Sequence, residues 1–185
     1  GLKKCDFQTT INGKKTDLYI LKNKSGNEVA ITNYGGAIQA IMIPDKNGNY
    51  ANVIQGHDNI NSVINSPEPY LSTLIGRYGN RISKGKFQLN GKEYQLPINN
   101  GPNSLHGGIN GFNKKVWDAL MMNNETLILN YVSSYGEEGY TGEVKVTVEY
   151  TFNDNNELII EYMATTNKKT IINLTSHGYF SLTGI

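Results

Sequence analysis

The chain has 185 residues, which suits one domain and allows a sizeable core without a disulfide or metal staple. Seventeen basic side chains nearly balance sixteen acidic ones, so the formal net charge is +1. Because no basic stripe is present, we expect no nucleic-acid partner. No apolar run approaches the roughly 20 residues of a membrane-spanning helix. The single cysteine, Cys5, cannot form a disulfide within the chain.

The sequence begins at Gly1 rather than Met, so we expect that a leader, a tag or a start methionine has been removed. The compartment therefore stays open: the cytoplasm or, after removal of a leader, the periplasm or the cell exterior. Twenty glycines and twelve tyrosines indicate a turn-rich β protein with an aromatic, hydrogen-bonding surface. Such a surface suits sugar binding without proving it.

Apolar and polar residues alternate along most of the chain, which is the pattern of half-buried strands. In chain order the pattern predicts strands at 17–21, 28–32, 37–43 and 52–55, a short helical turn at 60–64, hairpins at 87–96, 116–132 and 144–164, and a last strand at 170–174. The first hairpin turns at Asn90-Gly91, the pair that a type I′ turn favours. The sequence therefore predicts an all-β, antiparallel sandwich or barrel with almost no helix.

Three segments interrupt this pattern with glycines and polar residues, namely 76–81, 99–108 and 173–180. Irregular segments held by a rigid sheet are the usual place for binding chemistry. Glu137 and Glu138 lie in another glycine-rich segment, and adjacent acids there predict a solvated loop; the alternative is a contact to a sugar hydroxyl at the rim of a site. The only tryptophan, Trp117, alternates with Val116 and is predicted to lie in the core rather than to form a sugar platform.

The three histidines differ in their surroundings. His57 lies among turn residues and is predicted to be solvated. His106 precedes two glycines, which let backbone or a ligand approach its ring. His177 follows two hydroxyl residues where an apolar strand ends. For His106 and His177 the residues alone leave a surface role and a catalytic role open.

Several classes of site are not supported by the sequence. Zinc sites usually take three or four ligands, some of them locally paired, and the chain has no such histidine or cysteine pair. It also lacks the Gly-x-Ser-x-Gly elbow of many serine hydrolases and the spacing of a phosphate-binding loop. We therefore expect neither a metal nor an organic cofactor.

Five separated motifs nevertheless occur in an order and at a spacing that resemble one family, the aldose 1-epimerases. They are Asn33-Tyr34-Gly35-Gly36, Gly76-Arg77-Tyr78-Gly79-Asn80-Arg81-Ile82, Asn103-Ser104-Leu105-His106-Gly107-Gly108, Gly136-Glu137-Glu138-Gly139-Tyr140 and Asn173-Leu174-Thr175-Ser176-His177-Gly178-Tyr179-Phe180. The resemblance covers essentially the whole chain and implies the galactose-mutarotase-like β-sandwich.

The resemblance also implies roles for individual residues. His177 corresponds to the general acid that protonates the ring oxygen of a sugar, and His106 to the second active-site histidine. Arg81, with Asn80 beside it, corresponds to the substrate-binding arginine. Two departures are mild: Gly79 stands where the family commonly has alanine, and Gly178 where it commonly has serine.

Family members are about twice as long, and their general base, a glutamate, would lie beyond Ile185. We therefore expect residues 1–185 to be the N-terminal portion of a single epimerase domain, incomplete without its C-terminal remainder and inactive alone. The implied function is interconversion of the α and β anomers of free aldoses such as galactose and glucose. The alternative is a non-catalytic carbohydrate-binding β-sandwich.

Overall fold

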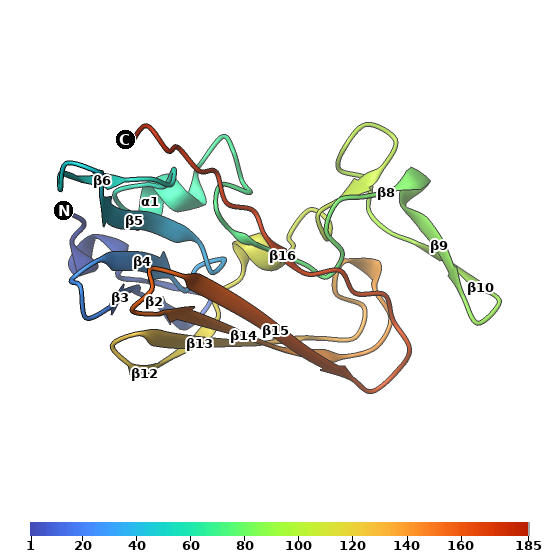
Figure 1. Ribbon diagram of the computed structural model, residues 1–185. Coiled ribbons are helices and arrows are strands. Elements are labelled where there is room, and N and C mark those ends of the chain that lie inside the picture. Colours follow the sequence, from blue (N-terminus) through green and yellow to red (C-terminus); the bar gives the residue numbers. More distant parts are fainter. Residues whose placement is uncertain (185) are drawn as a thin grey trace.

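The computed structural model describes residues 1–184, of which nearly all the regular structure is antiparallel β-sheet (Figure 1). Strands account for 45% and helices for 10% of the chain, which confirms the predicted all-β class. One four-stranded sheet contains, in spatial order, β3 (Leu18–Lys22), β4 (Glu28–Thr32), β5 (Ile38–Pro44) and β6 (Tyr50–Asn52). The other contains β12 (Asp118–Asn123), β13 (Thr126–Ser133), β14 (Val144–Phe152) and β15 (Leu158–Thr166).

Shorter elements surround these two sheets. Four two-stranded ladders pair β1 (Thr9–Ile11) with β2 (Lys14–Thr16), β7 (Leu74–Ile75) with β16 (Thr175–Ser176), β8 (Arg81–Ile82) with β11 (Ser104–Leu105), and β9 (Lys86–Leu89) with β10 (Lys92–Gln95). The helical segments are α1 (Ile60–Ile64) and the 3₁₀ turns η1 (Lys4–Phe7), η2 (Ser83–Gly85), η3 (Phe112–Lys114) and η4 (Glu137–Gly139). No helix among residues 1–184 is long and apolar enough to cross a membrane.

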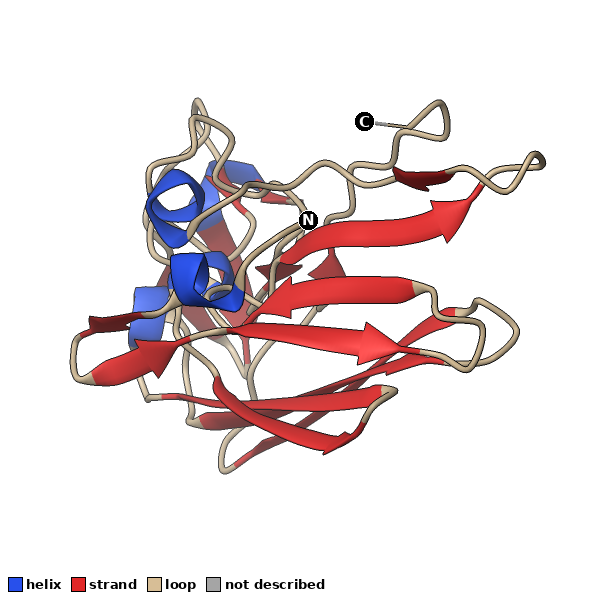
Figure 2. Cartoon of the chain, turned by 90° about the vertical axis from the view of Figure 1, so that its left-hand side faces the viewer, coloured by secondary structure: helices blue, strands red, loops and turns tan. Residues whose placement is uncertain are grey.

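The main core lies between the two four-stranded sheets, whose strands form stacked layers in Figure 2. Along β14 every second side chain, from Val144 to Phe152, is at most 2% exposed, while the residues between them point outward. These side chains share one apolar cluster with Leu21, Val29 and Ile31 of the first sheet. Burial of a period-two face against a second sheet is the packing of a β-sandwich.

The first sheet is covered on its other side as well. A second cluster joins Leu18 and Ala30 of the sheet to Phe7 of η1 and to Ile60 and Val63 of α1. Because both faces of β4 are covered, four of its five residues are buried. The predicted helical turn at 60–64 is confirmed, and its Asn59 cap accepts a hydrogen bond from the Ser62 amide at 2.9 Å.

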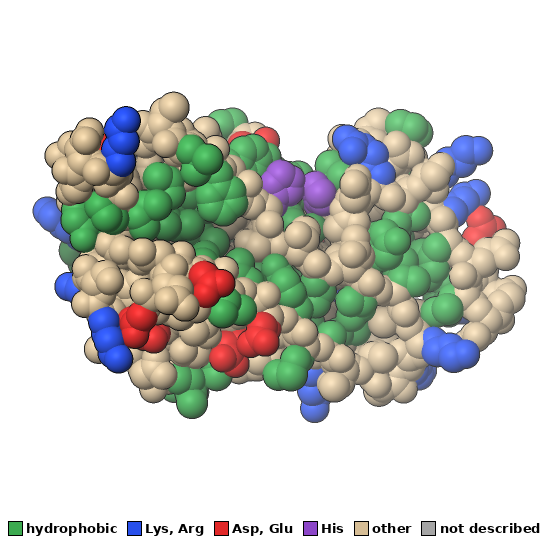
Figure 3. Space-filling model, viewed as in Figure 1, with side chains coloured by type: hydrophobic (Ala, Val, Ile, Leu, Met, Phe, Trp, Pro, Cys, Tyr) green, Lys and Arg blue, Asp and Glu red, His purple; other side chains and the backbone are tan. Residues whose placement is uncertain are grey.

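The two ladders β8–β11 and β9–β10 project from one end of the molecule, at the right of Figure 1. The space-filling surface is hollowed into a notch between this projection and the sheets, and histidine side chains lie at its floor (Figure 3). The sandwich therefore supplies one wall of the notch and the projecting ladders supply the other.

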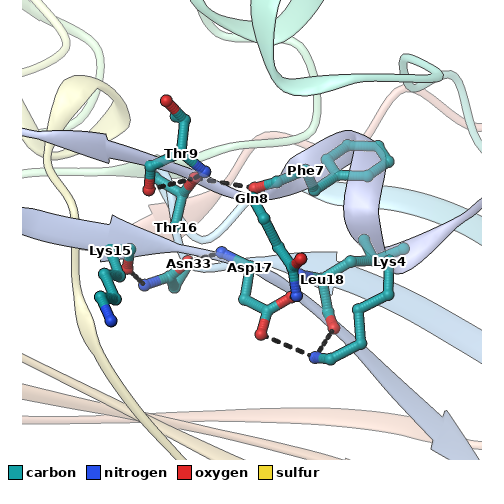
Figure 4. A network of polar contacts seen from close by, with 9 residues as sticks. All are labelled: Lys4, Phe7, Gln8, Thr9, Lys15, Thr16, Asp17, Leu18 and Asn33. Carbon is teal, nitrogen blue, oxygen red and sulfur yellow. Dashed lines mark hydrogen bonds and ion pairs between the residues drawn. The ribbon is translucent and has the colours of Figure 1, made fainter.

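A buried asparagine ties the N-terminal ladder to both sheets. The Asn33 side chain is 3% exposed, donates to the carbonyl oxygens of Lys15 and Trp117, and accepts from the Asp17 amide. Asp17 also pairs with Lys4 at 2.8 Å in the same network (Figure 4). Since all its polar atoms are bonded, Asn33 can be buried at low cost.

Two of the strand predictions are wrong: one strand has other bounds and one is absent. The strand predicted at 52–55 ends at Asn52, because the Asn52 side chain accepts from the amides of Ile41 and Ile54 and so replaces part of the ladder. No strand forms at 170–174. There Asn173 bonds instead to the irregular 77–79 segment, its amide donating to the Arg77 carbonyl and its carbonyl accepting from the Gly79 amide.

The turn between β4 and β5 is held by one buried phenol. Gly36 has φ +55° there, and the Tyr150 hydroxyl, on the opposite sheet, donates to its carbonyl oxygen at 2.8 Å. Tyr150 is 0% exposed. This bond joins the two sheets through the core.

We predict that Tyr150→Phe lowers the free energy of unfolding by about 1–3 kcal/mol, because the Gly36 carbonyl would be left buried and unpaired. Urea denaturation of the full-length protein measures the loss. Tyr162→Phe is the matched control, since its half-buried hydroxyl makes no hydrogen bond within residues 1–184. Equal losses in the two variants would contradict the prediction.

Candidate active site

Two histidines from distant parts of the sequence meet in the notch. His106 directly follows β11 and His177 directly follows β16, and their ring centroids are 5.2 Å apart with the planes nearly perpendicular. Histidine side chains lie side by side in the notch in Figure 3. His177 is held by its backbone: its amide donates to the Thr73 carbonyl at 2.8 Å and its carbonyl accepts from the Ser72 amide at 2.9 Å.

Two tyrosines complete an aromatic cluster around the histidines. The Tyr70 ring lies edge-on to His106 with centroids 4.7 Å apart, and 6.5 Å from His177. Tyr179 stacks on His177 at 4.9 Å. Neither tyrosine was predicted for the site from the sequence. Tyr179 lies inside a quoted motif, but Tyr70 follows Pro69 in a segment whose composition indicates only a turn.

One hydrogen bond defines the proton state of His106. The Asn80 amide donates to His106 Nδ1 at 2.9 Å, and the His106 amide donates back to the Asn80 carbonyl. Because Nδ1 accepts, the neutral ring carries its proton on Nε2, which is left as the donor. Burial lowers the pKa of His106 below its ordinary 6.5, and the nearby His177 and Arg81 lower it further, against a smaller opposing effect of Glu68.

The glycines after His106 have a steric reason. Gly107 has φ +88°, and a Cβ placed there would collide with the carbonyl oxygen of Gly76. Only glycine allows this backbone to lie against the 76–81 segment. Gly107 therefore permits a close approach of protein backbone, while the predicted approach of a group to the His106 ring stays a prediction.

The structure places Asn80 and Arg81 next to the histidines. Arg81 is directly opposite Leu105 in the β8–β11 ladder, one residue before His106. Its side chain is exposed, and its Nε donates to Asn100 Oδ1 at 2.9 Å. Asn80 has φ +68°, and its side-chain oxygen accepts from the Arg81 amide. All four residues that the sequence predicted for the site, His106, His177, Asn80 and Arg81, thus lie around one notch.

The other arginine of the same motif is buried under the site. Arg77 is 2% exposed, and its guanidinium donates to Ser133 Oγ and to the carbonyl oxygens of Ser133, Ser134, Thr141 and Gly142 at 2.8–3.1 Å. Its planar fork matches this ring of acceptors, which an ammonium group could not. Arg77 therefore fixes the 133–142 segment to the strand end that continues into Asn80 and Arg81.

This network corrects the prediction that Glu137 and Glu138 are solvated. Glu137 accepts hydrogen bonds from Ser133 Oγ and the Tyr131 hydroxyl, and its side chain is 16% exposed. Glu138 accepts from the Asn110 amide at 2.9 Å. Burial and the adjacent Glu137 carboxylate raise the pKa of Tyr131, so its hydroxyl stays a donor. The loop is ordered by these contacts rather than by solvent.

His57 was also predicted to be solvated, but the residue is half-buried. Its Nε2 is buried, and burial lowers the pKa of the ring. Its backbone amide donates to Gln39 Oε1 at 2.7 Å. The turn composition around His57 describes its backbone correctly, but the ring lines a small cavity together with Val63 of α1 and Thr73. His57 does not join the histidine pair.

A large cavity lies away from the notch. It has a volume of about 1100 Å³, lies over the first sheet and is lined by Leu2, Ala30, Met42 and Tyr50 among others. Within residues 1–184 no three His, Cys, Asp or Glu side chains are placed to hold a metal ion. The candidate site is therefore identified by its side-chain chemistry rather than by cavity size.

We predict that Arg77→Lys lowers the free energy of unfolding by at least about 2 kcal/mol, because an ammonium group leaves buried carbonyl oxygens unpaired. Arg81→Lys is the matched control in the same motif and should change it by less than about 0.5 kcal/mol, since Arg81 is exposed. Chemical denaturation compares the two variants. A loss at Arg81 as large as that at Arg77 would refute the structural role given to Arg77.

We also predict that His106 titrates below pH 6.5 in an NMR titration of its ring nitrogens, with the proton on Nε2 above that point. A lowered pKa means that the unfolded chain binds a proton first as the pH falls. The contribution of His106 should therefore lower the free energy of unfolding as the pH falls from about 6.5 through the lowered pKa of the folded state. Above about pH 6.5 it should have no such effect. A titration midpoint above 6.5 would overturn the assignment.

The comparisons with known proteins agree on one family. The family model described as aldose 1-epimerase matches residues 17–185. The chain is 45% identical to the galactose mutarotase of Bos taurus over 156 residues, which are 84% of this chain and 45% of that protein. It is 32% identical to the aldose 1-epimerase of Escherichia coli K12 over 179 residues, covering 94% of this chain and 50% of that protein.

Solved structures give the same result. The GalM/aldose epimerase homologue from C. elegans superimposes with a TM-score of 0.86 at 31% identity, over 90% of this chain and 51% of that one. Galactose 1-epimerase from Lactobacillus acidophilus superimposes with a TM-score of 0.84 at 26% identity, over 97% and 53%. The chain spans about half the length of the curated relatives it matches. With a family match over residues 17–185 and these neighbours, the chain belongs to the aldose 1-epimerase family.

Proposed function

We propose that the protein containing this chain is an aldose 1-epimerase, an isomerase that interconverts the α and β anomers of a free aldose such as galactose or glucose. The observation that carries the proposal is the histidine pair, with rings 5.2 Å apart in the notch. Relatives bearing the names galactose mutarotase and aldose 1-epimerase support the same reading.

The reaction needs two coordinated proton transfers. A base removes the proton of the anomeric hydroxyl while an acid protonates the ring oxygen, so the bond between the anomeric carbon and the ring oxygen breaks and an open-chain aldehyde forms. After rotation about the adjacent C–C bond, the ring closes on the other face of the aldehyde with the protons moving in reverse. Since every proton removed is returned, the cycle needs no cofactor.

The two histidines suit different parts of this chemistry. His106 is held neutral with Nε2–H as its donor, so it can bind and polarise a sugar oxygen without giving up a proton. His177 has its backbone fixed by Ser72 and Thr73, and its ring is not tied by a hydrogen bond within residues 1–184. It is therefore the proposed general acid for the ring oxygen, since an imidazole can donate and recover a proton near neutral pH.

Asn80 and Arg81 are the proposed substrate-binding residues. Arg81 presents an exposed guanidinium beside the notch, with forked donors that suit pairs of sugar hydroxyls. Asn80 orients His106 through its amide and Arg81 through its side chain. We assign the general base to none of the glutamates of this chain, because none lies in a motif that matches the one around the family's general base.

The alternative is a carbohydrate-binding β-sandwich that keeps the notch without the reaction. It would use the same Arg81 and aromatic rings, and the two proposals differ only in whether a base faces His177. A glutamate opposite His177 in the full-length protein favours the enzyme. The comparisons do not bear out the expectation that residues 1–185 are inactive alone, and it stays a prediction.

We predict that His177→Asn in the full-length protein lowers kcat by at least about 100-fold, as the loss of a general acid does. His106→Asn should impair both kcat and KM, because that ring binds the substrate as well. The measurement is the approach of α-galactose to anomeric equilibrium, followed by polarimetry or NMR.

His57→Asn is the matched histidine control and should leave turnover nearly unchanged, because His57 lies outside the pair. If His57→Asn abolished turnover while His177→Asn did not, the roles would be misassigned. If no variant or parent turned over sugar but the parent bound galactose with an affinity reduced by Arg81→Lys, the binding alternative would replace the proposal.

A further inference from the structure

A small cavity lies behind the segment that carries Tyr70. It has a volume of about 20 Å³ and is lined by His57, Thr73 and Asn113, together with Tyr34, Val63 and Glu68 among others. A cavity needs about 10–15 Å³ to hold one water molecule. Its size therefore suits one water and leaves little room for anything larger.

Three buried polar atoms of the residues that line this cavity lack hydrogen-bond partners within residues 1–184. His57 Nε2, Thr73 Oγ1 and Asn113 Oδ1 are each buried without a hydrogen bond among the described residues. Thr73 is 3% and Asn113 2% exposed. Leaving one such group unpaired costs about 1–3 kcal/mol, so three around one cavity point to a common ligand.

The orientation of Asn113 is set independently of the cavity. Its Nδ2 donates to the Pro69 carbonyl at 3.0 Å, which leaves Oδ1 as the unpaired acceptor. The other two partners are a hydroxyl and the imidazole of His57, whose pKa is lowered by burial. The ligand must therefore donate to Asn113 while it accepts from, or donates to, the other two groups.

We propose that this cavity is a specific binding site for one structural water, bridging His57 Nε2, Thr73 Oγ1 and Asn113 Oδ1. Water can donate hydrogen bonds to Asn113 Oδ1 and to an unprotonated His57 Nε2 while it accepts a hydrogen bond from the Thr73 hydroxyl. Three bonds are typical for a buried water. A cation would seek more oxygen ligands than these neutral groups supply.

The site would join three separate segments behind the histidine pair. His57 precedes α1, Asn113 belongs to η3, and the Thr73 carbonyl accepts the His177 amide at 2.8 Å. Asn113 also holds Pro69, the neighbour of Tyr70. The proposed water thus completes the support of the segment from Pro69 to Thr73. This inference does not depend on the proposed function.

The sign of one substitution tests the proposal in the full-length protein. Thr73→Val keeps the side-chain shape and removes the hydroxyl. If the hydroxyl binds the water, Thr73→Val should lower Tm by about 2–5 °C. If the hydroxyl is buried without a partner, the same change should leave Tm unchanged or raise it, which would overturn the proposal. Thr10→Val, at an exposed strand position, is the control and should shift Tm by less than about 1 °C.

A double-mutant cycle separates a shared water from unrelated packing effects. His57→Phe should lower Tm by itself. In the Thr73→Val background the same change should lower Tm by less than half as much, because the water bridge is already broken there. Fully additive losses would contradict a shared ligand.

A crystal structure at about 1.5 Å gives the direct readout. One water peak within hydrogen-bond distance of all three atoms, absent in Thr73→Val, is the expected result. No peak, or a peak with the short distances of a bound cation, would overturn the proposal.

Discussion

The buried guanidinium of Arg77 is the contact on which the arrangement of the notch depends. It takes a positive charge out of water and surrounds it with the carbonyl oxygens of the 133–142 segment and with Ser133 Oγ. Such a charge is tolerated only when its donors are bonded. Glu137 adds a carboxylate on the far side of Ser133. The loop therefore has to close around Arg77, and the backbone that continues to Asn80 and Arg81 is fixed as a result.

The second constraint is electrostatic. Two imidazole rings that lie 5.2 Å apart disfavour a state in which both are charged. An interaction with one of the rings can determine which of them stays neutral. The backbone amide of Asn80 provides this interaction, because it donates a hydrogen bond to His106 Nδ1, the atom that a second proton would have to occupy. The same amide belongs to the segment that Arg77 anchors. The proton state of the site is thus linked, through backbone, to a charge buried beneath it.

Much of the fold could be predicted from the sequence, because period-two burial is a local signal. The strand at Val144–Phe152 has five apolar residues facing one core, and no long-range knowledge is needed to find it. The strand predictions were wrong in two situations. In one, a side chain takes the place of the backbone partner in a ladder; in the other, the segment bonds to an irregular segment instead of a strand. Asn52 ends β6 early in the first way. Asn173 bonds to the 77–79 segment in the second way.

The site was predicted less evenly. His106, His177, Asn80 and Arg81 were found only through family motifs, since composition could not separate a surface histidine from a catalytic one. Tyr70 carried no signal, because its role comes from the two histidines that the fold brings to it. The sequence also failed at His57, because its neighbours in the chain are turn residues, whereas in space its ring lines a small cavity with Val63 and Thr73.

The two arginines of the motif from Gly76 to Ile82 lie in different environments. In a regular strand, residues four positions apart point to the same face, so Arg77 and Arg81 would share an environment. Residues 76–80 are not a regular strand: β7 ends at Ile75, β8 begins at Arg81, and Asn80 has φ +68°, a conformation that asparagine tolerates better than most residues. Arg77 is buried while Arg81 is exposed. This irregular backbone thus separates the arginine that holds the scaffold from the exposed arginine beside the notch.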